Sequence, residues 1–158
     1  MFPTLNPITG EDESFLLAVY SSTRADEMAM VPWSDEQKNA FLLMQFQAQI
    51  QYYRERYPQA SFDVIKLDNK SIGRFYVAEL DDQIRIIELT ILPEHRNKGI
   101  GSKLIEEILE KARQQKKPVR IYLENFNPAV RLFSRLGFKP GAEEGIYVLW
   151  RWAPDEIK

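Results

Sequence analysis

Hydrophobic and polar positions in the first third of the chain predict two helices. Apolar residues recur at helical spacing over residues 11–22, which predicts a short first helix. Ser34 and Gln37 have the spacing of a capping box, and the apolar positions after them predict a long second helix that ends at Pro58. Several large apolar residues here are expected to lie mainly in the core, although the link over 28–33 is an alternative place for an acceptor pocket: Met28, Met30, Trp33, Phe41 and Phe46.

The rest of the chain alternates between strands and helices. Residues 62–67 and 71–80 have the pattern of two strands joined by a turn. Residues 84–91 are almost continuously branched and apolar, which is typical of a strand in a sheet interior. The pattern then predicts an amphipathic helix over 101–114, a strand over 118–123, a helix over 128–136 followed by Gly137, and a strand over 146–152.

This order of elements predicts a three-layer α/β fold. We expect a mixed, mostly antiparallel sheet of six or seven strands with helices on both faces. The chain has 158 residues and shows no internal repeat, low-complexity tract or Gly/Ser-rich linker. Residues 1–158 are therefore predicted to form a single domain.

Composition excludes several kinds of chemistry. With no cysteine and one histidine, His95, the chain lacks the residues for disulfides, a cysteine nucleophile or a multi-histidine metal centre, so we expect no metal. The net charge of -2 makes nucleic acid or an anionic membrane a poor partner. No segment has the ~20 apolar residues of a spanning helix and the start does not look like a signal peptide, so a cytoplasmic location is the default expectation.

The segment over residues 87–104 has the design of an anion-binding site. A buried strand leads through a turn with Gly99 and Gly101 into a helix, and glycines and free helix-start amides suit a phosphate. Arg96, Lys98 and Lys103 add positive charge. The turn lacks the ending of a P-loop, and Leu104 stands where a dinucleotide motif has its third glycine, so neither common motif fits.

Two blocks of sequence resemble the GNAT superfamily of coenzyme A-dependent N-acyltransferases. The first is Arg96-Asn97-Lys98-Gly99-Ile100-Gly101, which matches the pattern Arg/Gln-x-x-Gly-x-Gly/Ala after a strand and a proline. The second, over residues 127–138, resembles the family's Asn-x-x-Ala-x-x-Leu-Tyr-x-x-x-Gly-Phe segment. The resemblance covers roughly residues 72–152, whereas the first two helices match only in kind, as the variable acceptor-facing part of such folds.

The resemblance implies acetyl-CoA as co-substrate and a set of residues that bind it. Asn127 would contact the pantetheine, and Ala129 and Phe133 would line the thioester end. The central strand and the region of Asn125 would splay to admit the pantetheine. Amides of one turn would cradle the pyrophosphate, namely those of Arg96, Asn97, Lys98, Gly99, Ile100, Gly101 and Ser102. The backbone of a strand end would pair with the pantetheine and polarise the thioester, namely that of Leu89, Thr90 and Ile91.

Phe133 departs from the family pattern, which has a tyrosine there to protonate the leaving thiolate. Because a phenyl ring carries no such proton, either another group or water is the acid, or the thiolate leaves unprotonated, or the protein is no efficient enzyme. Tyr122 and Tyr147 are candidate acids. An acceptor ammonium must lose a proton before it attacks, and Glu124 and Glu88 are the candidate bases, although each taken singly is more often a paired surface carboxylate.

The resulting functional hypothesis is an N-acetyltransferase that moves acetyl from acetyl-CoA to a primary amine of a small molecule or peptide, by direct attack in a ternary complex. One alternative is a non-catalytic coenzyme A-binding or regulatory domain, favoured by the missing tyrosine at Phe133. Another is an unrelated phosphate binder or interaction module. The sequence does not identify the acceptor, the acyl length or the oligomeric state, and a homodimer is compatible with it.

Overall fold

The computed structural model of the chain describes residues 2–154 and has seven strands. Hydrogen bonding orders them β1-β2-β3-β4-β5-β7-β6 in a mixed sheet, in which β4 and β5 are parallel. The predicted α/β fold with six or seven strands is therefore confirmed. The strands are β1 (Thr4–Pro7), β2 (Ser61–Leu67), β3 (Lys70–Glu79), β4 (Ile84–Ile91), β5 (Val119–Glu124), β6 (Lys139–Glu144) and β7 (Tyr147–Trp152). The helices are η1 (Gly10–Asp12), α1 (Glu13–Ser22), α2 (Ala25–Ala29), α3 (Asp35–Arg56), η2 (Pro93–His95), α4 (Ile100–Gln115) and α5 (Val130–Arg135).

The described chain forms two compact units. The N-terminal unit comprises residues 2–75 and 90–96, and the C-terminal unit comprises residues 76–89 and 97–154. Strands β3 and β4 each contribute residues to both units. That the whole chain acts as a single domain stays a prediction.

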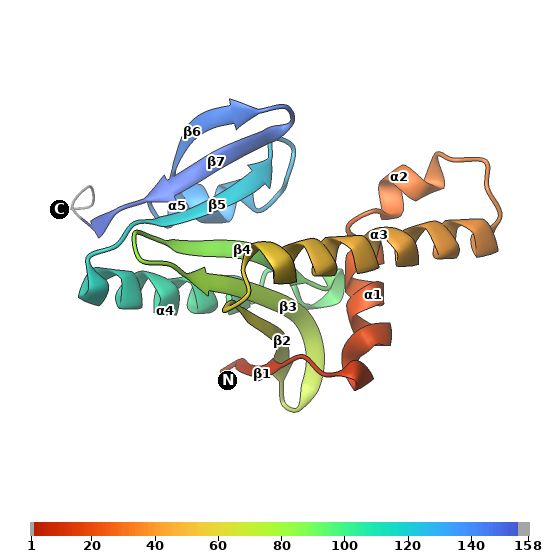
Figure 1. The fold of residues 1–158 in the computed structure, drawn as a ribbon, viewed down its shortest axis with the longest axis horizontal. Coiled ribbons are helices and arrows are strands. Elements are labelled where there is room, and N and C mark those ends of the chain that lie inside the picture. The colour runs from red at the N-terminus through yellow and green to blue at the C-terminus, as the bar shows by residue number, and fades with distance from the viewer. Residues whose placement is uncertain (1, 155–158) are drawn as a thin grey trace. The chain divides into compact units, whose positions relative to one another are not determined.

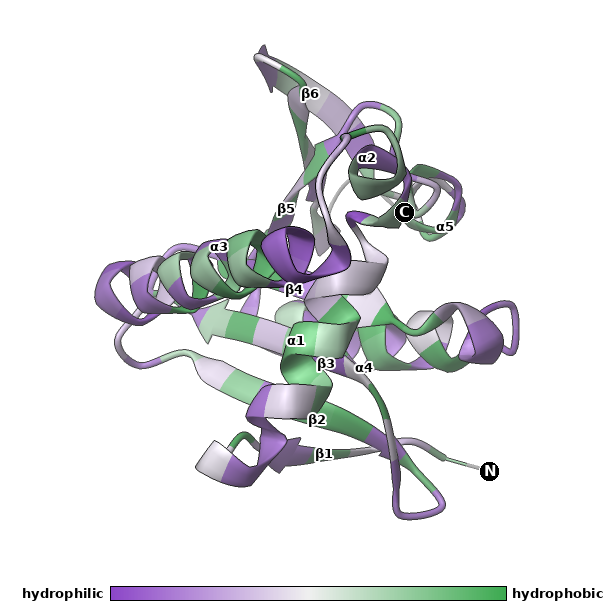
Figure 2. Cartoon of the chain, turned by 90° about the vertical axis from the view of Figure 1, so that its right-hand side faces the viewer, coloured by the Kyte–Doolittle hydropathy of each residue, from purple (hydrophilic) through white to green (hydrophobic). Residues whose placement is uncertain are grey.

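In the N-terminal unit, α1 and α3 pack with β2 around a shared apolar cluster (Figure 1). The hydrophobic residues of α1 face this cluster, and the helix is mainly green in Figure 2. The predicted capping box is present, because the Ser34 side chain accepts from the Gln37 amide at 3.1 Å and Gln37 reciprocates. The buried members of the cluster are Leu16, Tyr20, Leu42, Phe46 and Val64. Full burial of a leucine, valine or phenylalanine side chain stabilises a fold by about 1.5–3 kcal/mol.

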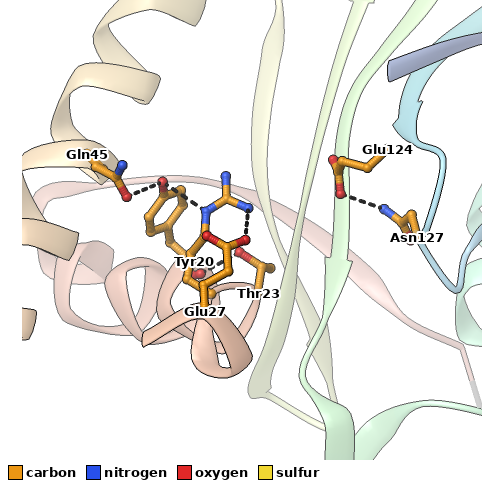
Figure 3. A network of polar contacts seen from close by, with 7 residues as sticks. Tyr20, Thr23, Glu27, Gln45, Glu124 and Asn127 are labelled. Atoms are coloured by element: carbon orange, nitrogen blue, oxygen red, sulfur yellow. Dashed lines mark hydrogen bonds and ion pairs between the residues drawn. The ribbon is translucent and has the colours of Figure 1, made fainter. Parts of the chain in front are cut away.

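A polar cluster fixes α1 against α3 in the same unit (Figure 3). The Tyr20 hydroxyl donates to Gln45 Oε1 at 3.2 Å and accepts from Arg24 Nε at 3.4 Å. Glu27 forms a long ion pair with Arg24, at 4.0 Å. Tyr20 can therefore be buried with its hydroxyl satisfied, which is the usual condition for a core tyrosine.

The link between α2 and α3 does not lie in the core. Met30 is 85% exposed and Trp33 is 41% exposed, so the expectation that they are core residues is wrong. Their spacing looked helical, but they lie between two helices, where no helix face holds them against the sheet. Trp33 packs edge-on against the half-buried Phe41, with ring centroids 5.3 Å apart.

Strands β3 and β4 approach each other closely at Gly73. A Cβ atom there would overlap the carbonyl oxygen of Thr90 and lie 3.0 Å from Ile91 Cα. We expect Gly73→Ala to lower the free energy of unfolding by about 1–3 kcal/mol, because the obstructing atoms are backbone and cannot rotate away. Thermal unfolding tests this, with Gly10→Ala as control because no atom lies within 4 Å of the added Cβ. Equal melting temperatures of the two variants would contradict the prediction.

In the C-terminal unit, α4 buries its apolar face and β5, β7 and β6 run side by side (Figure 1). The buried residues of α4 include Leu104, Ile105 and Leu109, as its amphipathic pattern predicts. The alternating burial of β5 places Ile121 and Leu123 in the core and leaves Glu124 half-buried. Lys111 donates to Glu79 Oε2 at 2.9 Å and holds the pKa of Glu79 below its usual range, but this exposed pair adds at most about 1 kcal/mol.

Sequence patterns did not predict β1 and β6. Every residue of both strands is exposed, and each strand pairs with one neighbour at an end of the sheet order. Without a buried face they lack the alternation of hydrophobic and polar residues by which strands are recognised. None of the helices in the described part of the chain is long and apolar enough to cross a membrane.

Candidate active site

The turn that opens α4 has the backbone of an anion-binding site. Asn97 and Gly99 both have positive φ, at 62° and 79°, and no side chain caps the start of α4. The first amides of a helix have no partner within the helix and lie at the positive end of its dipole. A Cβ at Gly99 would meet no atom within 4 Å, so the turn is open on that side. It can therefore bind a phosphate through backbone amides.

Arg135 brings positive charge to this helix start, although sequence reasoning did not select it. Its Nη2 atom donates to Ser102 Oγ at 3.1 Å, from the last residue of α5 to the first turn of α4. Because Ser102 Oγ accepts this bond, its own hydrogen remains available to an anion. A cation beside a helix N-terminus is unfavourable by itself, which makes the place attractive to a negatively charged ligand. The only signal in the sequence was a basic residue shortly before Gly137.

Removing the charge of Arg135 is expected to weaken the binding of a phosphorylated ligand. Arg135→Gln should raise the Kd for coenzyme A about 3- to 10-fold, and the dependence of log Kd on log salt should become shallower. Calorimetry at two salt concentrations measures both effects. Lys139→Gln, which removes one positive charge from the exposed β6, is the control. An equal increase in Kd in the two variants would show that the affinity depends on the net charge of the protein and not on the position of Arg135.

Strands β4 and β5 separate within the C-terminal unit. Their described register pairs are Ile84 with Val119 and Arg85 with Arg120, yet both strands continue for several residues. On its other side β5 pairs with β7 over its whole length. From Ile121 onward, the edge of β5 that is directed toward β4 therefore has no register pair with β4 among the described residues. This agrees with the splay that the resemblance implies. Backbone groups at such an edge can pair with an extended ligand that carries amides.

Glu124 and Asn127 are joined at the end of β5 (Figure 3). Asn127 Nδ2 donates to Glu124 Oε2 at 3.4 Å, while Asn127 Oδ1 accepts from the amide of Ala129 at 2.8 Å. The amide of Asn127 donates to the Glu124 carbonyl at 2.9 Å, which closes a tight turn. A candidate base and two residues of the second sequence block therefore lie together.

The candidate acids differ in their surroundings. Tyr147 on β7 lies directly opposite Glu124 on β5, so the two side chains stand on the same face of the strands. The Tyr122 hydroxyl donates to Glu144 Oε1 at 3.4 Å, and the guanidinium of Arg85 lies 5.0 Å from its ring centroid. Of the two, Tyr147 is better placed to exchange a proton near Glu124.

The other predicted site residues lie on β4, on α5 and in the N-terminal unit. Glu88 is half-buried on β4, beyond the last β4–β5 register pair. The ring of Phe133 is 1% exposed and packs edge-on against Phe138, with centroids 5.0 Å apart. In the N-terminal unit, Arg96 Nε donates to the Ile91 carbonyl at 2.8 Å, and Thr90 is buried. No group of three or more potential metal-ligating side chains occurs within residues 2–154.

The glycine turn beside Arg135 and the β5 edge whose pairing with β4 ends early belong to the same unit of a mixed α/β sheet. Such a pair of features would suit a long ligand that carries both phosphates and amides. A model of the acetyltransferase (GNAT) family matches residues 19–138, and the chain belongs to this family.

Solved structures share the fold at low sequence identity. A PaiA N-acetyltransferase from Thermoplasma acidophilum in complex with coenzyme A has 17% identity and a TM-score of 0.72, covering 97% of this chain and 99% of that one. PH1933 from Pyrococcus horikoshii OT3 has 18% identity and a TM-score of 0.73, covering 96% and 98%. A GNAT family acetyltransferase from Elizabethkingia anophelis with acetyl-CoA bound has 18% identity and a TM-score of 0.59, covering 96% and 97%. No curated protein sequence matches the chain significantly.

Proposed function

We propose that the protein is an N-acetyltransferase that uses acetyl-CoA as co-substrate and a primary amine of a small molecule or peptide as acceptor. The observation that carries the proposal is the early end of the β4–β5 ladder in the unit that also holds the open turn at Gly99. A pantetheine arm is an extended chain with two amides, and a pyrophosphate is an anion, so this pair of features suits coenzyme A. Family membership and two neighbours with coenzyme A or acetyl-CoA bound support the same cofactor.

In this proposal the amides of Asn97 to Ser102 bind the pyrophosphate, with Arg135 adding charge. Asn127 Nδ2 has two hydrogens, so it can contact both Glu124 and the pantetheine. Pairing of Leu89, Thr90 and Ile91 with the pantetheine stays a prediction, as do the roles of Ala129 and Phe133.

The chemistry requires one proton acceptor and one proton donor. Glu124 removes a proton from the acceptor ammonium, and the resulting amine attacks the thioester carbon. The C–N bond forms, the C–S bond breaks, and the sulfur leaves as a thiolate that takes a proton from Tyr147 or from water. The nitrogen then gives its second proton to the resulting tyrosinate or hydroxide, so the products are a neutral amide and a thiol. Acetyl passes directly between the substrates, since the chain has no cysteine to carry it. Glu88 is the second candidate for the base.

Calorimetric titration with acetyl-CoA and with free coenzyme A tests the cofactor. We expect micromolar dissociation constants for both. A screen of amines in which free thiol is detected then tests turnover. Absence of binding to either nucleotide would refute the proposed cofactor and the proposed reaction together.

A non-catalytic coenzyme A-binding domain is the alternative, and the buried Phe133 favours it. The family's usual tyrosine hydroxyl is absent there, and the ring of Phe133 is enclosed against Phe138. Such a domain would bind coenzyme A without releasing thiol in the presence of any amine. A cytoplasmic location and the oligomeric state stay predictions.

A further inference from the structure

We propose that Asn127 is a positioning residue that holds the Glu124 carboxylate in place for proton removal. The inference rests on the proposed function, in which Glu124 is the base. It concerns a bond between two side chains of this protein, in addition to any contact of Asn127 with the pantetheine.

The orientation of the Asn127 amide is determined by its surroundings. Its oxygen accepts from the backbone amide of Ala129 at 2.8 Å, and only an oxygen can accept that hydrogen. The nitrogen must therefore point the other way, where it meets Glu124 Oε2 at 3.4 Å. The backbone bonds from Asn127 N to Glu124 O and from Val130 N to Asn127 O hold the turn on both sides.

This arrangement gives Oε2 of Glu124 a donor that is itself fixed by the turn. The turn is anchored to the β6–β7 turn, because the amide of Asn125 donates to the carbonyl of Ile146 at 2.8 Å. A bond of 3.4 Å is long, and catalytic hydrogen bonds often shorten when substrate binds. In this proposal Asn127 orients Glu124 and takes no part in the proton transfer itself, because a carboxamide neither gains nor loses a proton at neutral pH.

Asn127→Asp separates this role from a purely structural one. An aspartate oxygen can still accept from the amide of Ala129, so the turn and the melting temperature should be retained. It cannot donate to Glu124 and places a like charge beside it. We expect kcat at saturating acetyl-CoA to fall roughly 10- to 100-fold, the range for loss of a hydrogen bond to a charged group. The Kd for coenzyme A is measured separately, because the variant also loses the donor that is assigned to the pantetheine. Gln114→Glu, which adds the same charge at an exposed position of α4 in the same unit, is the control and should keep kcat near wild type.

A double-mutant cycle with Glu124→Gln is the decisive measurement. If Asn127 acts through Glu124, Asn127→Asp should cause little further loss of kcat in the Glu124→Gln background. Wild-type kcat in Asn127→Asp, or an equal loss in both backgrounds, would overturn the inference.

A readout without turnover separates this inference from the proposed function. In the unliganded protein, Glu124→Gln should shift the side-chain NH2 resonances of Asn127 in a 15N NMR spectrum, whereas Glu88→Gln should leave them unchanged. If the wild-type protein acetylates no amine, the proposed function fails and this spectrum alone decides whether Asn127 holds Glu124. Resonances that are unchanged by Glu124→Gln would refute the bond even in an active enzyme.

Discussion

Replacement of Glu124 by glutamine is expected to lower kcat about 10²- to 10⁴-fold, the usual contribution of general acid–base catalysis. Glutamine has nearly the same shape, and its amide oxygen can still accept from Asn127 Nδ2, so the fold should be retained. It cannot take a proton from an ammonium at neutral pH. The Kd for acetyl-CoA should change little, since the carboxylate is assigned to the acceptor side.

Steady-state rates over a range of pH measure this effect. The variant should be partly rescued at high pH, where more of the acceptor amine is already deprotonated. Glu88→Gln is the matched control, because it makes the same change on β4. A large loss in Glu88→Gln with an unchanged pH–rate profile in Glu124→Gln would exchange the roles of the two glutamates.

Replacement of Gly99 by valine is expected to raise the Kd for coenzyme A at least about 10-fold, which corresponds to about 1.4 kcal/mol. A valine at φ 79° is strained by about 1–3 kcal/mol, so the turn either changes conformation or stays strained. Because nothing lies within 4 Å of the new Cβ, the protein itself has room for the side chain. The added methyl groups would instead occupy the open side of the turn, where a phosphate would bind.

Gly145→Val is the matched control for this prediction. Gly145 has φ 63° and also has no atom within 4 Å of an added Cβ, but it lies in the turn between β6 and β7. Both variants should therefore lose similar stability in thermal unfolding, and only Gly99→Val should lose cofactor affinity in calorimetry. Equal affinities in the two variants would show that the turn at Gly99 does not bind the pyrophosphate.

Local features of the candidate site could be predicted from the sequence. The positive φ of Gly99 and the open start of α4 follow from neighbouring residues, since glycine favours that conformation and the helix begins directly after it. The amphipathic pattern of α4 and the capping box at Ser34 are local as well. Each of them depends on residues within a few positions of one another.

Other features depend on residues far apart in the chain, and periodicity does not encode them. Arg135 meets Ser102 only because α5 and α4 pack in the same unit, 33 positions apart in sequence. Met30 and Trp33 looked like core residues, but their exposure depends on the path of the α2–α3 link. The edge strands β1 and β6 gain their structure from one paired neighbour instead of from a buried face.

By itself, the sequence determined the elements around the turn, the glycine at the start of α4, and the two motifs of the family, because each depends on consecutive residues. Only the tertiary structure decided where the β4–β5 ladder ends, that Tyr147 stands opposite Glu124, and that Asn127 turns its nitrogen toward this glutamate. Strand register and side-chain orientation follow from hydrogen bonds between partners that the chain brings together only when it folds.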